Sequence, residues 1–268
     1  MSLYLLPPPL LLIIALVVAV ALACAGQIWV HRRFSSQEFV RHNEVGGFII
    51  AVVGTVYAVV LGFLTVIVWQ HFVNARDLVA QETAATTDTW HVSVGLPTPE
   101  RRRVREDVQR YAQLMVNTEW PIMREGNFDK EADALLMDAI TAAGMIVPAN
   151  EREANAQSQT LAQLSAIHDA RLRRLSINLT GVSGFEWLVL IIGALCVVSF
   201  CWMFGLANPT VHLLMTSAVT IVVVATLVLL FELQYPFRSQ IGVGDRMWRG
   251  VIDHIQLMEN SNLKDMHM

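Results

Sequence analysis

Charge is missing from three long stretches of the chain. No Asp, Glu, Lys or Arg occurs in residues 1–31, 45–75 or 187–231. An α-helix needs about 20 apolar residues to cross about 30 Å of hydrocarbon, so the first two stretches each hold one span. The third stretch is long enough for a helical hairpin that turns at Asn208-Pro209. The chain is therefore predicted to cross a membrane four times, which excludes most soluble enzymes.

The rest of the composition agrees with a membrane protein. Charged residues make up 16% of the chain and hydrophobic residues 54%, whereas a soluble domain carries about 25% charged residues. The longest block of one charge is Arg101-Arg102-Arg103, which indicates no nucleic-acid surface. Residues 1–26 precede any Lys or Arg and form too long an apolar run for a signal peptide, so we expect a retained first span. The expected surroundings are membrane lipid.

Motifs for catalysis, metals and cofactors are also missing. The three cysteines, Cys24, Cys196 and Cys201, lie inside predicted spans, without disulfide or zinc-ligand spacing. The Gly181–Gly184 segment lacks the glycine spacing of a nucleophile elbow, and the histidines form no HExxH motif. We therefore expect no enzyme, no metal and no cofactor.

Ionisable residues are scarce at mid-membrane. Glu44, His71, Glu186 and Glu232 lie close to span ends, and His212 lies near the start of the fourth span. Transporters and pumps commonly carry such groups at mid-membrane, where they are costly and functional. The pattern thus disfavours a proton-coupled transporter and a proton-conducting energiser of the stator type.

Glu232 allows two interpretations. It closes the fourth span just before Tyr235-Pro236, where the helix is expected to stop and enter the headgroup layer. It is therefore either an interfacial anchor or the partner of an arginine such as Arg76.

Glycine and proline divide the chain into helices. The four expected spans are residues 10–30, 45–69, 187–206 and 211–231. Neither Gly nor Pro occurs from Phe63 to Val94, so the second helix is expected to continue into water as far as 95–97. Soluble helices are then expected over about 98–121, 129–143 and 150–180. The last carries an apolar face of Leu161, Leu164, His168, Leu172, Leu175 and Leu179.

No strand pattern appears, so the predicted fold is all-α. We expect a four-span helical membrane protein with a membrane-adjacent helical bundle formed by the region between spans two and three. The expected division is 1–75 for spans one and two, 76–185 for the soluble helical region, 186–235 for spans three and four, and 236–268 for a C-terminal tail.

Four spans place both termini and residues 71–185 on one side, with a polar loop at 31–44 on the other. Basic residues near the spans favour the cytoplasm for the first side, by seven to three, although the uncharged N-terminus followed by His31-Arg32-Arg33 would by itself put the N-terminus outside. The seven are Arg76, Arg171, Arg173, Arg174, Arg238, Arg246 and Arg249, and the three are Arg32, Arg33 and Arg41.

The second span is the most patterned segment. A stripe of small residues follows helical spacing: Gly47, Ala51, Gly54, Ala58, Gly62 and Thr65. Such a stripe lets another helix approach closely, so it either packs against a neighbouring span or lines a pore in an oligomer. Another face carries bulkier residues that could form an apolar constriction: Val52, Val56, Val60 and Phe63. Gln70, His71 and Asn74 are candidates for a pore mouth.

Two motifs resemble a bacterial family of unassigned function that is described as bestrophin-like. The first motif consists of three segments: His42–Phe48, residues 54–63 and Val68–Phe72. The second, Glu232–Phe237, resembles the family's acidic-x-x-x-Pro-Phe ending, although Ser239 stands where a glycine often follows.

The resemblance implies a function. Bestrophins are pentameric anion channels with four spans, cytoplasmic termini and a pore lined by the second span. It predicts a homo-oligomeric ion channel, a pentamer that conducts chloride, in the bacterial inner membrane. The alternative from another class is a non-conducting membrane-anchored sensor or assembly subunit, whose helical region binds a partner.

Overall fold

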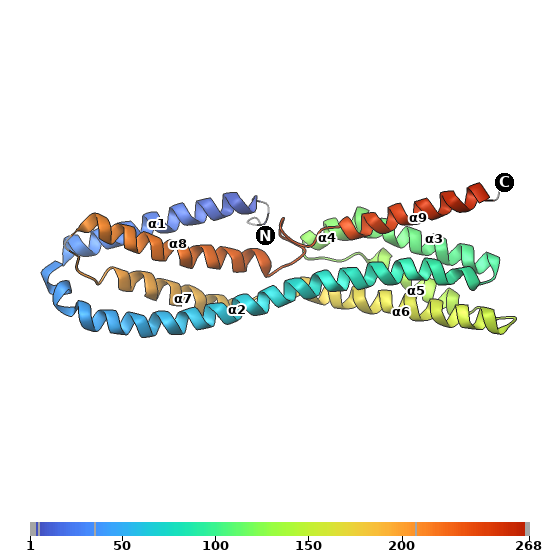
Figure 1. The fold of residues 1–268 in the computed structure, drawn as a ribbon, viewed down its shortest axis with the longest axis horizontal. Coiled ribbons are helices and arrows are strands. Elements are labelled where there is room, and N and C mark those ends of the chain that lie inside the picture. Colours follow the sequence, from blue (N-terminus) through green and yellow to red (C-terminus); the bar gives the residue numbers. More distant parts are fainter. Residues whose placement is uncertain (1–3, 5, 35, 207, 266–268) are drawn as a thin grey trace. The chain divides into compact units, whose positions relative to one another are not determined.

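The computed structural model describes residues 4, 6–34, 36–206 and 208–265, and these residues form helices joined by turns and loops (Figure 1). The elements are α1 (Pro8–Arg33), α2 (Ser36–Val92), η2 (Ser93–Gly95), α3 (Thr98–Leu114), η3 (Met115–Glu119), α4 (Trp120–Arg124), α5 (Lys130–Gly144), α6 (Glu151–Leu179), α7 (Gly184–Cys201), α8 (Pro209–Leu233) and α9 (Arg246–Asp265). Among them α1, α2, α7 and α8 are long and apolar enough to cross a membrane. The predicted all-α fold with four spans is confirmed.

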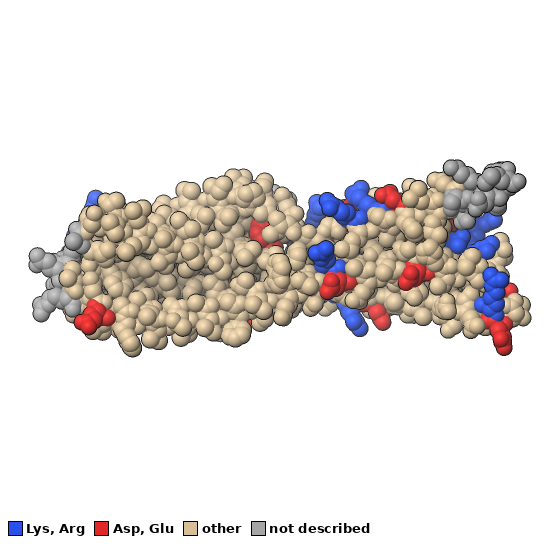
Figure 2. Space-filling view, viewed as in Figure 1, with Lys and Arg blue, Asp and Glu red and all other residues tan. Residues whose placement is uncertain are grey.

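The chain divides into two compact units. The membrane unit contains residues 1–70, 181–234 and 239–241, and the soluble unit contains residues 71–180, 235–238 and 242–268. The first half of α2 belongs to the membrane unit and its second half to the soluble unit. Charged side chains are sparse over the membrane helices in Figure 2 and gather over the soluble helices.

In the membrane unit, bulky side chains pack on glycines of neighbouring helices. The ring of Trp202 fills the space that a Cβ at Gly26 would occupy, and Tyr57 of α2 does the same at Gly193 of α7. Asn43 ties α2 to the loop after α7, because its amide accepts from the Gly205 N–H (3.0 Å) and donates to the Gly205 carbonyl (2.8 Å). These contacts set which face of α2 turns toward its own chain.

The second helix differs from the prediction at its start but not at its end. It stops at Val92, where η2 leads to Leu96, as the missing Gly and Pro predict. However, it begins at Ser36, so the expected polar loop at 31–44 is largely helical. Residues 36–45 contain no Gly or Pro, so nothing in the sequence stops a helix between Ser36 and the expected start of the second span.

The soluble unit has its own core. It is built around the side chains of Tyr111, Met115, Leu164, Ile167, Trp248 and Ile255, all buried. Side-chain caps begin two of its helices: Asp129 accepts from the N–H of Glu131, and Asn150 from that of Glu153. The helix α9 contributes Trp248 and Ile255 to this core, so the 236–268 segment is part of the folded bundle rather than only a tail.

Two expectations for the soluble helices are wrong in detail. The helix from Thr98 passes Pro121 and ends at Arg124, because the wide π-helical turn η3 precedes α4 and leaves Pro121 in the first turn of α4, where proline is tolerated. In α6 the expected apolar face is rotated: Leu172 and Leu179 are exposed, 48% and 61%.

One membrane span also differs from the prediction. The span α7 ends at Cys201, five residues before the expected end at Leu206.

We expect Gly193→Leu to destabilise the membrane unit, because the added side chain must displace Tyr57. Overpacking of this kind costs about 1–3 kcal/mol. The measurement is thermal unfolding in detergent, with Gly184→Ala as the control, since a Cβ at Gly184 meets open space. Equal melting temperatures for the wild type and the Gly193→Leu variant would contradict the packing of α2 on α7.

Candidate pore face and buried charge network

The stripe of small residues on α2 faces away from its own chain. A Cβ added at Gly47, Gly54 or Gly62 would meet no described atom within 4 Å, and Ala51 and Ala58 are exposed. The Thr65 hydroxyl donates to the Leu61 carbonyl (2.8 Å), which satisfies it within the helix. Spans of the same chain therefore do not cover this stripe.

The bulky residues of α2 are exposed as well. Phe63 is 68% exposed, Val56 61%, Val52 53% and Val60 37%. On a helix of 3.6 residues per turn, their mean direction lies about 160° from that of the small stripe. Buried residues of the same helix, Tyr57, Leu61 and Val68, point in a third direction. The helix α2 thus presents two distinct outward faces, one small and one bulky.

The pore-mouth candidates divide between faces. Gln70 and Asn74 are exposed and follow Phe63 at helical spacing, so they extend the bulky face. His71 is half-buried and lies about 100° around the helix from Gln70. The structure brings Gln70 and Asn74 into line with the candidate constriction and leaves His71 out of it.

A longer pattern emerges along this face. Ten positions with alternating steps of four and three are all exposed: Val56, Val60, Phe63, Ile67, Gln70, Asn74, Asp77, Gln81, Ala84 and Asp88. A repeat of about 3.5 residues marks the seam along which helices associate in a left-handed bundle. We call these ten residues the α2 seam. Its first four members are apolar and the remaining six are polar or small.

Glu232 lies at the end of α8 and is buried. The Ser239 hydroxyl donates a hydrogen bond to its Oε2. Among the described residues no ion pair includes Glu232, so the pairing with Arg76 is not observed. Ser239, which departs from the family pattern, supplies the partner instead.

A network of buried charges in the soluble unit was not predicted from the sequence. Its centre is Arg174 of α6, whose Nε and Nη2 donate to the Glu82 carboxylate of α2 at 2.6 and 3.0 Å. Both side chains are fully buried. Arg174 also contacts Glu119 of η3 at 3.4 Å.

Arg171 extends the network by one helical turn. Its Nη2 lies 3.2 Å from Glu119 Oε2 and donates to the Asp129 carbonyl at 2.7 Å, while its Nη1 donates to the half-exposed Asp133 at 2.8 Å. Two fully buried guanidiniums therefore face two fully buried carboxylates. This balance is what makes charge tolerable in a protein interior.

Tyr111 of α3 completes the cluster, since its hydroxyl donates to Glu82 Oε1 at 2.6 Å. Burial and then the Glu82 charge raise the pKa of Tyr111 well above its usual value, so this phenol stays neutral. Burial opposes the charged form of Arg174, but Glu82 and then Glu119 raise its pKa above the usual value. Arg174 is thus charged and Tyr111 is neutral.

Two features hid these residues from sequence analysis. The leucines of α6 indicated a face that excluded the arginines, whereas the buried face contains Arg171 and Arg174. Glu119 turns inward on η3, and the wide turn of a π-helix has no simple sequence pattern. Such turns occur frequently at functional sites.

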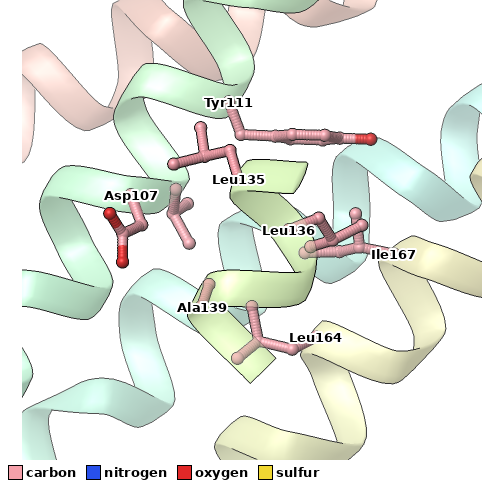
Figure 3. Close-up of a pocket in the computed structure, with 8 residues that line it drawn as sticks. Asp107, Tyr111, Leu135, Leu136, Ala139, Leu164 and Ile167 are labelled. Atoms are coloured by element: carbon pink, nitrogen blue, oxygen red, sulfur yellow. The ribbon is translucent and has the colours of Figure 1, made fainter. Parts of the chain in front are cut away.

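The described residues of the soluble unit enclose a small cavity and border an open groove. A cavity of about 10 Å³ lies between α3, α5 and α6, where Asp107, Leu135 and Ile167 are among the lining residues (Figure 3). It has room for about one water molecule at most. An open groove of about 400 Å³ lies between α2 and α6. Among the described residues no group of His, Cys, Asp and Glu could hold a metal ion.

We expect Glu82→Gln to destabilise the soluble unit strongly, because it leaves Arg174 buried without its main counter-charge. Breaking a buried pair costs about 3–5 kcal/mol. The matched control is Arg110→Ala, which breaks an exposed pair with Glu131 of the same length, 2.6 Å. Exposed pairs contribute at most about 1 kcal/mol. Chemical denaturation that shows equal losses for the two variants would contradict the network's role.

Known proteins are similar to this chain in sequence pattern and in fold. The family model of the Bestrophin-like domain matches residues 17–247. A bacterial bestrophin homolog from Klebsiella pneumoniae, solved by Zn-SAD phasing, is similar with a TM-score of 0.68 and 15% identity, over 90% of this chain and 97% of that chain. A point mutant of the Klebsiella pneumoniae homolog gives a TM-score of 0.69 and 15% identity, over 91% and 98%. No curated protein matches the chain.

Proposed function

We propose, because the chain belongs to the Bestrophin-like family, that it forms an oligomeric ion channel whose pore is lined by α2. Bestrophins are oligomeric anion channels, and the observation that carries the proposal is the α2 seam, whose ten residues are all exposed. Copies of the chain place this face of Val, Phe and Ile side chains around a shared lumen. Pentamers in the bacterial inner membrane, with cytoplasmic termini, fit this proposal.

The bulky face forms the constriction in this proposal. Val52, Val56 and Phe63 are large, apolar and exposed, and a ring of such side chains gates a pore by excluding water. The small stripe at Gly47–Thr65 lies on the other outward face, where it lets the neighbouring copy approach closely. The polar residues Gln70 and Asn74 then border water next to the constriction.

The test of conduction is ionic current from purified protein in planar bilayers under a salt gradient. Discrete openings from folded, oligomeric protein support the channel. Silence from such protein would reject the channel and favour the sensor or assembly subunit, whose soluble helices bind a partner.

We expect Phe63→Ala to raise the single-channel conductance, because it removes the largest side chain of the constriction. The control is Leu195→Ala on α7, which changes a residue of similar exposure, 64%, on another helix.

Gly54→Leu separates the two faces of α2. We expect it to weaken assembly, as seen in size-exclusion chromatography, because it fills the stripe that packs on the neighbour. Normal assembly with altered conductance would instead assign the stripe to the pore.

A further inference from the structure

We infer that α1 and α8 enclose a water-binding site inside the membrane unit, at the level of Gln27 and Thr216. The site uses no residue of α2, so the inference goes beyond the proposed channel and does not depend on it. Buried polar groups in a membrane need partners within the protein or from bound water, because hydrocarbon offers them none.

The two helices run antiparallel, which contacts at both of their ends establish. Tyr4, just before α1, stacks on Phe231 near the end of α8, with ring centroids 4.6 Å apart. At the other end, His31 in the last turn of α1 meets His212 in the first turns of α8, with ring centroids 5.1 Å apart. The position of any residue on one helix therefore indicates its neighbour on the other.

This register places Gln27 opposite Thr216. Gln27 precedes the histidine of α1 by four residues, and Thr216 follows the histidine of α8 by four. Residues four apart share a helix face, so both side chains point into the α1–α8 interface, one turn further from the helix ends than the histidine pair. Slightly deeper, Cys24 Sγ lies 3.4 Å from Ser217 Oγ, which agrees with the same register.

Both side chains are buried with a polar atom that has no partner. Gln27 is 3% exposed and Thr216 1%, and neither Gln27 Oε1 nor Thr216 Oγ1 forms a hydrogen bond with a described residue. Further along α8, the hydroxyls of Ser217, Thr220 and Thr226 donate to the carbonyl four residues back, at 2.7, 2.7 and 2.9 Å. Thr216 does not make this bond, so its hydroxyl is available to a ligand.

Trp202, which follows α7, brings a third such group to α1. Its ring occupies the space that a Cβ at Gly26 would take, next to Gln27 in the chain. The indole Nε1 is buried and has no hydrogen-bond partner among the described residues. The three groups are an amide oxygen that accepts, an indole N–H that donates and a hydroxyl that can do both.

One water molecule matches this set. A buried water makes about three hydrogen bonds, and here it donates to Gln27 Oε1 and accepts from Thr216 and Trp202. Water reaches the site from the end of α1, where His31 is half-buried. A water-mediated polar contact therefore joins the first span to the fourth, in addition to apolar packing.

The direct test is a cryo-electron microscopy map of the purified full-length protein at a resolution that shows ordered water. We expect density within about 2.7–3.2 Å of both Gln27 Oε1 and Thr216 Oγ1. The density disappears in Thr216→Val, which keeps the shape of the side chain and removes its hydroxyl. A direct hydrogen bond between the two wild-type side chains, or closed packing with no density between them, would overturn the inference.

A double-mutant cycle of melting temperatures in detergent measures the same site independently. We expect Gln27→Leu and Thr216→Val each to lower the melting temperature by about 2–4 °C, because each leaves the opposite group buried with a poorer partner. The double variant loses less than the sum, because replacing both polar partners by apolar groups is nearly neutral. The control is Thr226→Val, whose hydroxyl is satisfied within α8, so its effect adds to that of Gln27→Leu. Additive losses for Gln27 and Thr216 would contradict a shared water.

Discussion

The structure depends on one constraint: backbone amides in hydrocarbon must find their partners within the same segment. Helices satisfy this rule locally, which is why each of the four spans is helical. The helix α2 carries the consequence furthest, because it continues without a break from Ser36 to Val92 and belongs to both units. The first half of α2 therefore supplies the candidate constriction, and its second half supplies Glu82 to the soluble unit.

Within the soluble unit the buried network fixes the rotation of α2. Glu82 must face Arg174, and the bond between Tyr111 and Glu82 strengthens that choice. Once Glu82 points inward, Gln81 and Asp88 point outward. In the membrane unit the packing of Tyr57 on Gly193 has the same effect on the apolar half of the helix. Each of these two sets of contacts thus fixes which residues are exposed in its own half of α2.

Much of this fold was predictable because strong local rules decide it. Charge-free length gave the spans, and the positions of Gly and Pro gave the end of α2 and the bounds of α5. The start of α2 differs from the prediction because a polar segment is typical both of a loop and of an exposed helix. The network was missed for another reason: Arg171, Arg174 and Glu119 are charged, and residue type alone predicts exposure. Their burial depends on partners from distant parts of the chain, which periodicity cannot reveal.

Part of the candidate site was likewise predictable from the sequence, and part of it was not. Exposure distinguishes Val52, Val56 and Phe63 from the buried Tyr57 and Leu61, although all five are apolar and look alike in sequence. The spacing that joins Phe63 to Gln70 and Asn74 is present in the sequence. It gained meaning only when every member proved to be exposed.

Thiol modification tests the central claim, that the α2 seam faces the pore, most directly. The experiment introduces Phe63→Cys into a background in which Cys24, Cys196 and Cys201 are replaced, and records current before and after a bulky water-soluble thiol reagent. We predict that the reagent blocks the current, and that it has no effect on the same protein with Leu195→Cys instead. Current that persists after complete modification at position 63 would contradict a pore lined by this face of α2.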